Sequence, residues 1–207
     1  MVVSRWKENI QWTQHSPYPV VICNHGSGLA GGCDVPVNKG AEASAFLKYI
    51  LGYWNTLPDT IIFVDAHETS WHQSTSIFPR IEAYRGQDYW GLNDVNVDTQ
   101  DNKNWNYDKF KQIWDSVVFP HLHQPCPKRI QTNGSAQFIV TKAAIRRHSK
   151  ELYADLYAYT IGSKRWTGDA SWADAIGFSY QPGGPPDSHV GGAFFLEWIW
   201  EIIFHGK

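Results

Sequence analysis

The chain has 207 residues, of which 43% are hydrophobic and 18% are charged, and its net charge is -2. This length suits one domain with its own core, and the composition excludes wholesale disorder. Without an excess of basic residues, the sequence gives no reason to expect binding to nucleic acid or to an anionic membrane surface. The 11 tryptophans predict either a core rich in large rings or platforms on which sugars stack.

The sequence contains three cysteines, Cys23, Cys33 and Cys126. Their odd number and the lack of paired metal-ligand spacing favour free thiols, and we expect Cys23, in a strand-like run, to be reduced and buried. The N-terminal segment has no apolar signal core, and no stretch approaches transmembrane length. We therefore expect a cytoplasmic protein without a membrane span. The end after an apolar helix would also fit a domain from a longer polypeptide, whose other domains would be its partners.

The first third of the chain alternates strands and helices. Residues 1–6 and 18–23 read as strands, a Gly-rich loop follows, and apolar residues at helical spacing predict a helix over 41–54. Residues 61–64 are an unbroken apolar run, typical of a strand buried on both faces. This alternation favours an α/β fold with parallel neighbouring strands.

The rest of the chain adds further elements in order. The pattern predicts a short helix over 109–119, a strand over 136–140, a helix over 142–159 with Thr141 as its N-cap, and an apolar helix over 191–204. Between the last two helices lies a long loop, 162–188, of the kind that is often functional. We predict a single α/β domain over residues 1–207, with a central, mostly parallel mixed sheet of about six strands flanked by helices.

The strand at 61–64 stops being apolar within one residue, giving Asp65-Ala66-His67. In open α/β sheets ligands bind at the carboxyl ends of the strands. A carboxylate and an imidazole at this spacing suit Mn²⁺ or Mg²⁺ with positions left for diphosphate oxygens. The alternative is an ordinary polar strand end, because three-residue patterns have many false positives.

This motif resembles the Asp-x-Asp or Asp-x-His metal signature of nucleotide-sugar glycosyltransferases with the GT-A fold. In the Asp-x-His form a distant histidine nearer the C-terminus completes the metal site, and His189 is the candidate here. The wider layout is similar to a small GT-A domain of a glycosyltransferase encoded by a chlorella virus, which would place the protein in a host cytoplasm. The segments that carry this similarity are 2–8, 38–42, 65–67, 136–140 and 196–198.

The resemblance implies a role for several residues. Asp65 and His67 would be metal ligands, with His189 as a third. Donor contacts would come from the strand ends and from the segment that leads into the first helix: Ser4, Arg5, Asn24, Asn38, Glu42 and Asp65. Glu42 would orient a sugar hydroxyl or back up the metal; alternatively it is only a favourable charge at a helix start, and Arg5 only a surface arginine.

The long loop offers acids and aromatic rings for the acceptor. Asp169, Asp174 and Asp187 are candidates for a catalytic base, and we assign that role to Asp174. Trp166, Trp172 and Tyr180 are candidates for stacking an acceptor sugar. By similarity to the Asp-x-His families we expect retention of the anomeric configuration.

The sequence therefore predicts a Mn²⁺-dependent (or Mg²⁺-dependent) glycosyltransferase of the hexosyl or deoxyhexosyl type. Its donor would be a nucleotide diphosphate sugar, with UDP as the expected nucleotide, and its acceptor a carbohydrate. Two alternatives stay open. One is a metal-dependent hydrolase that uses the Asp65/His67 cluster, and the other is a non-catalytic, Trp-rich carbohydrate-binding module.

Overall fold

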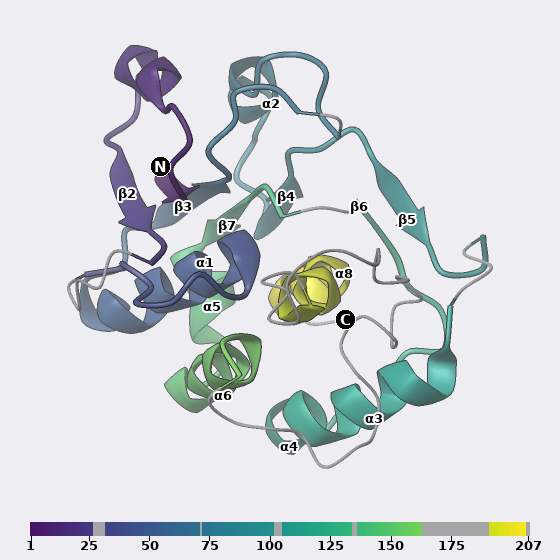
Figure 1. Ribbon diagram of the computed structural model, residues 1–207. Helices are drawn as coiled ribbons and strands as arrows, with labels where there is room; N and C mark the ends of the chain where they lie inside the picture. The colour runs from purple at the N-terminus through teal and green to yellow at the C-terminus, as the bar shows by residue number, and fades with distance from the viewer. Residues whose placement is uncertain (27–31, 71, 102–104, 134–135, 163–190, 206–207) are drawn as a thin grey trace.

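Five strands form a central sheet with helices on both of its faces (Figure 1). This computed structural model describes residues 1–26, 32–70, 72–101, 105–133, 136–162 and 191–205, with the backbone alone for 191–194. The strand order is β2-β1-β3-β7-β4, and a separate two-stranded sheet pairs β5 with β6. The strands are β1 Val2–Arg5, β2 Val21–Asn24, β3 Thr60–Val64, β4 Tyr89–Gly91, β5 Asn96–Asp98, β6 Gln131–Asn133 and β7 Phe138–Thr141.

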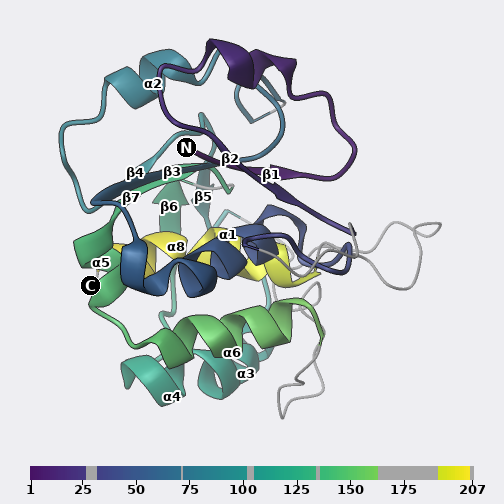
Figure 2. The same ribbon diagram turned by 90° about the vertical axis from the view of Figure 1, so that its left-hand side faces the viewer.

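The helices cover the sheet in layers (Figure 2). Two short helical segments, η1 and α2, lie on one face; α1 and α8 lie against the other, and α3, α4 and α6 form a further layer beyond them. The helices are η1 Gln11–His15, α1 Ala41–Gly52, η2 Trp54–Thr56, α2 Phe78–Glu82, α3 Tyr107–Val117, α4 Phe119–Leu122, α5 Lys142–Arg146, α6 Lys150–Thr160 and α8 Gly191–His205. Among the described residues, no helix is both long and apolar enough to cross a membrane.

Alternate side chains of the strands pack into two different apolar cores, because successive residues of a strand point to opposite faces of the sheet. Phe63 and Phe138 face the α1/α8 side, where Phe46 of α1 packs against both rings, with centroids 4.7 Å and 5.9 Å away. Ile62 and Ile139 face the smaller core under α2. Both faces of the sheet are therefore buried, and this explains why 61–64 is apolar without interruption.

The predicted α/β class is confirmed, and so is the parallel arrangement of the first third, because β1 pairs in parallel with both β2 and β3. The expected mixed sheet flanked by helices is confirmed, but it is not mostly parallel. Within the described residues the sheet has five strands and not six, and β7 pairs antiparallel with both β3 and β4. An apolar run predicts burial on both faces but carries no information about strand direction.

The predicted helix over 142–159 is two helices, α5 and α6. Thr141 caps the first as expected, since its hydroxyl accepts a hydrogen bond from the Ala144 amide at 3.0 Å. The break falls where Ser149 adopts an extended conformation, with φ -72° and ψ 158°, immediately before α6. Serine is a preferred residue at this boundary position, and it starts a second helix within an otherwise continuous pattern.

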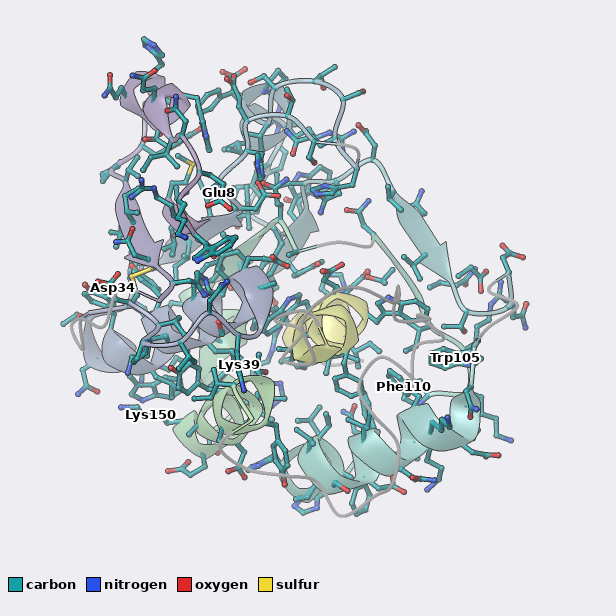
Figure 3. The ribbon with its side chains drawn as sticks, in the orientation of Figure 1. Glu8, Asp34, Lys39, Trp105, Phe110 and Lys150 are labelled. Carbon is teal, nitrogen blue, oxygen red and sulfur yellow. A yellow bond between two sulfur atoms is a disulfide. The ribbon has the colours of Figure 1, made fainter. Side chains whose placement is uncertain are left out.

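The expectation of a reduced Cys23 is also wrong, because Cys23 and Cys33 form a disulfide. The loop after β2 folds back: the Val35 amide donates to the Asn24 carbonyl and the Gly26 amide to the Val35 carbonyl, both at 2.9 Å. This return brings the two Cα atoms within 5.1 Å, a separation that a disulfide spans. Figure 3 shows the disulfide beside Asp34.

Candidate functional site

The parallel strands β1, β2 and β3 end at one edge of the sheet, and a cavity of about 550 Å³ opens there. Side chains from the ends of β1 and β3, the loops that follow them and the start of α1 line it. The lining residues are Ser4, Trp6, Glu8, His25, Asn38, Ala41, Glu42, Asp65, Ala66, His67, Thr69, Ser70 and His72. This is where an α/β sheet is expected to bind a ligand.

Asp65 and His67, the two predicted metal ligands, lie together at this edge. The Asp65 Oδ1 atom accepts a hydrogen bond from the His67 backbone amide at 2.8 Å, and the His67 Nδ1 atom lies 3.7 Å from the same oxygen. This hydrogen bond between residues two apart is that of an Asx turn, and it holds the Asp65 carboxylate in place. The His67 side chain is 57% exposed and that of Asp65 19%, so both are accessible from the cavity.

His72, for which the sequence indicates no role, contacts the other oxygen of Asp65. Its Nε2 atom lies 3.6 Å from Asp65 Oδ2 and 2.9 Å from the Ser70 hydroxyl, while its Nδ1 atom is hydrogen-bonded to Asn93 Oδ1 at 2.8 Å. Burial acts to lower the pKa of His72, but the contacts with Asp65 and Asn93 raise it overall. The Asp65 carboxylate therefore lies between two imidazoles.

Behind Asp65, two glutamates from different helices share a hydrogen bond. Glu42 is in the first turn of α1, as predicted, and Glu197 is on α8. Burial raises the pKa of Glu197 well above its ordinary value, and the neighbouring charges of Glu42 and Asp65 raise it further. Burial and Asp65 likewise raise the pKa of Glu42. Because two adjacent buried carboxylates repel each other, the pair favours a state that retains a proton.

On the opposite wall, Ser4 at the end of β1 meets His25, which follows β2. The Ser4 hydroxyl and His25 Nε2 are 2.9 Å apart, both residues are buried, and His25 Nδ1 has no hydrogen-bond partner among the residues that the structure describes. Burial lowers the pKa of His25 to about 4, although Glu8 and Asp34 act in the opposite direction. The imidazole is therefore neutral near pH 7.

The other predicted donor contacts divide into two groups. Asn38 lines the cavity, as do Ser4 and Glu42. Arg5 and Asn24 are not among the lining residues; the Arg5 guanidinium donates to Asn24 Oδ1 at 3.3 Å, and the Asn24 amide donates to Asp34 at 2.7 Å. These two residues hold the ends of β1 and β2 together.

His189, Asp174 and the rest of loop residues 163–190 lie outside the described residues, so the structure does not place the predicted third metal ligand or the predicted base. Sequence reasoning missed Trp6, His25 and Glu197. Trp6 and His25 each come one residue after a strand that ends at the cavity, which is the signal that could have found them. Glu197 lies in segment 196–198 of the resemblance, but nothing local indicates its contact with Glu42, which lies on another helix.

The cavity is acidic. Glu8, Glu42 and Asp65 line it, and none of its described lining residues is lysine or arginine. A carboxylate beside an exposed imidazole is a donor set that Mn²⁺ accepts, so Asp65 and His67 fit such an ion as two of its ligands. Within the described part of the chain, no group of three or more His, Cys, Asp or Glu side chains is arranged to hold a metal, so the remaining ligands would come from elsewhere.

Comparison with known proteins identifies the family. A family model described as "Protein of unknown function (DUF3431)" matches residues 1–83 and 79–207. The chain belongs to the DUF3431 family. No curated protein and no solved structure matches it. The chemistry of the cavity is therefore what points to the function of this DUF3431 member.

Proposed function

We propose that the protein is a metal-dependent glycosyltransferase that moves a sugar from a nucleotide diphosphate sugar to a carbohydrate acceptor. The observation that carries the proposal is the Asp65/His67 pair, at the carboxyl edge of parallel strands and facing a cavity large enough for part of a nucleotide. The resemblance of Asp-x-His to the GT-A metal signature supports the same chemistry.

The charge of the cavity explains why a cation would be required. Diphosphate oxygens beside Glu8, Glu42 and Asp65 would be repelled, and no lysine or arginine among the described lining residues offsets that repulsion. When bound, Mn²⁺ or Mg²⁺ supplies Lewis-acid stabilisation of the leaving diphosphate. Asp65 and His67 would hold the ion, and His189 is the proposed third ligand.

The walls of the cavity offer contacts for the rest of the donor. Trp6 lines the cavity and is 43% exposed, with the Lys7 ammonium 4.9 Å from its ring centroid, and an aromatic ring of this kind can stack on a base. The Ser4 hydroxyl and the neutral His25 form a polar wall beside it, and the Asn38 amide can bond to ribose or sugar hydroxyls. UDP is the proposed nucleotide.

Glu42 has the position and protonation behaviour to orient a sugar hydroxyl. It lines the cavity, and its hydrogen bond with Glu197 fixes its carboxyl group. Glu197, whose pKa is raised well above its ordinary value, can keep the proton of the pair, so the Glu42 carboxylate accepts a hydrogen bond from it and can accept another from a sugar hydroxyl. Asp174 stays the proposed base, and retention of configuration the proposed stereochemical outcome.

The test is UDP binding measured by isothermal titration calorimetry, with Mn²⁺ present and absent. Asp65→Ala should abolish the Mn²⁺-dependent part of the affinity, while Asp59→Ala should keep it. Asp59 is a matched control, because it lies just before the same strand β3, at its other end, and pairs with Lys142 at the surface. Equal Mn²⁺-dependent affinity in wild type and Asp65→Ala would contradict the proposal.

A panel of nucleotide sugars then separates the transferase from a hydrolase. A transferase should release UDP faster when a carbohydrate acceptor is added, because the sugar then has a productive destination. A hydrolase would release it at the same rate with or without acceptor. If the protein binds glycans but neither Mn²⁺ nor UDP, it is a binding module.

A further inference from the structure

His72 is held from behind by a network of buried amides. Its Nδ1 atom is bonded to Asn93 Oδ1 at 2.8 Å, and the Asn93 amide nitrogen donates to the Gln137 carbonyl at 3.2 Å. The Gln137 side-chain amide donates to Gln73 Oε1 at 2.6 Å and to Asn93 Oδ1 at 3.3 Å. Gln73, Asn93 and Gln137 are all 0% exposed.

This network joins three segments of the chain that meet at the sheet edge. Gln73 is in the loop after β3, Asn93 follows β4 and Gln137 immediately precedes β7. Burying amide groups is unfavourable unless they are hydrogen-bonded, and all the polar atoms of these three side chains except Gln137 Oε1 have a partner within the described part of the chain, which indicates a specific arrangement around the imidazole.

The hydrogen-bond pattern determines how the imidazole is oriented. Asn93 Oδ1 is an acceptor, because the nitrogen of the same amide donates to Gln137. The His72 Nδ1 atom must therefore carry a proton, and this bond turns the Nε2 side of the ring toward Ser70 and Asp65. This is how protein side chains orient a histidine beside a metal site, from the ring nitrogen that is remote from the site.

We propose that His72 is a positioning residue for Asp65. The His67 amide donates a hydrogen bond to Asp65 Oδ1, and the His72 ring, fixed by the amide network, lies with its Nε2 atom 3.6 Å from Oδ2, so its contact limits how far the carboxylate can turn. A ligand held in one orientation binds a cation more tightly than one that must be ordered on binding. The inference rests on the proposed function, because it gives His72 a role in cation binding at Asp65.

Two substitutions separate this role from a merely structural one. In His72→Asn the side-chain amide can replace Nδ1 and keep the bond to Asn93, but it cannot reach Asp65. In His72→Gln the amide can replace Nε2 and keep the contact with Asp65, but it loses Asn93. A positioning role predicts that His72→Asn is the damaging change, whereas a structural role in the buried network predicts that His72→Gln is.

The measurement is Mn²⁺ affinity without nucleotide, from calorimetry and from the electron paramagnetic resonance signal of free Mn²⁺. His72→Asn should lower the affinity about tenfold, and His72→Gln should stay within about twofold of wild type. His121→Asn is the matched control, since His121 contacts Asp155 at 3.0 Å on α4 and α6, away from the cavity. It should leave Mn²⁺ affinity unchanged.

Unchanged Mn²⁺ affinity in folded His72→Asn, together with clear binding by wild type, would overturn this inference and leave the proposed function intact. Absence of Mn²⁺ binding by wild type would overturn both. If His72→Asn does not fold, Ser70→Ala replaces it, because this change removes the hydroxyl on the same ring nitrogen. A folded Ser70→Ala variant should bind Mn²⁺ about threefold more weakly, and wild-type affinity in that variant would equally overturn the inference.

Discussion

Glu42 and Glu197 show how burial changes the protonation behaviour of a side chain. In the sequence, Glu42 is a charge in a first helical turn, where it is stabilised by the helix dipole. In the structure it faces a second carboxyl from α8. Because the desolvation of both groups and their mutual repulsion exceed the effect of the dipole, the pair holds a proton to higher pH than an isolated glutamate would.

Replacing Glu42 with glutamine should flatten the dependence of stability on pH. The pKa of Glu42 is raised from 4.5 to about 6, so between these values the folded state binds more protons than the unfolded state. Stability from this group is present below pH 4.5 and is lost as the pH rises through 6. The loss from Glu42 is on the order of 2 kcal/mol, and Glu42→Gln should remove it together with the part of the raised pKa of Glu197 that comes from the charge of Glu42.

The measurement is the difference in unfolding free energy between wild type and Glu42→Gln, from urea titrations at pH 4.5 to 7. His25 has the opposite effect, because its lowered pKa makes stability rise with pH between about 4 and 6.5, but that contribution is common to both proteins and cancels. Glu82→Gln, at an exposed position on α2, controls for the loss of a negative charge. A difference that does not change with pH would contradict the assignment.

At the residue scale, the sequence located the part of the site that is local along the chain. Asp65 and His67 follow one buried strand, so one apolar run and the residues after it were enough to predict their place. The contacts of His72 with Asn93 and of Glu42 with Glu197 join distant segments. A single sequence read for periodicity contains no signal for such pairs.

At the scale of elements, α1 is positioned by the glycine that precedes it. Gly40 has φ +77°, a conformation that favours glycine, and it lies against the end of α6. A Cβ atom at this position would lie 2.2 Å from the Thr160 methyl carbon and 2.9 Å from Ser44 Cβ. The close approach of α1 to α6, and with it the place of Glu42 in the cavity, depends on the missing side chain.

Gly40→Ala should therefore destabilise the protein by about 3 kcal/mol, the sum of the positive-φ strain and of overpacking. Gly86→Ala is the matched control, since Gly86 has φ +90° but nothing within 4 Å of its would-be Cβ. It should lose only about 1 kcal/mol. Thermal unfolding of both variants checks this, and equal losses would show that contact with α6 is unimportant.

Elements with several buried apolar residues in a recognisable pattern were predictable, and the shortest strands were not. α1 and α8 show apolar residues at helical spacing, and β3 contains an unbroken apolar run. β4, β5 and β6 have three residues each, too few for an alternation to be distinguished from chance. The direction of β7 could not be predicted from the sequence either, because the residues of a strand do not determine whether it runs parallel or antiparallel to its neighbour.

At the scale of the whole molecule, the disulfide changes the expected environment of the protein. Cys23 lies in β2, and Cys33 lies in the loop that returns to pair with His25 at the cavity wall. Disulfides persist in oxidising compartments, so the expectation of a reducing cytosol loses the support that it drew from the cysteines. The pair also restrains the wall that holds His25.

Removing this restraint should lower the free energy of unfolding. The sequence separation of 10 residues corresponds to a loss of about 3 kcal/mol in the chain-entropy description of a disulfide. We expect a double Cys23→Ala, Cys33→Ala variant to unfold at lower urea concentration than oxidised wild type. A thiol reductant should move the wild-type midpoint toward that of the variant and leave the variant itself unchanged.

Cys126 is present in both proteins and is buried, with a pKa that burial raises to about 12, so it does not contribute to the difference. If the reductant does not move the wild-type midpoint, Cys23 and Cys33 are not paired in the folded protein, and the cytosolic expectation regains its basis.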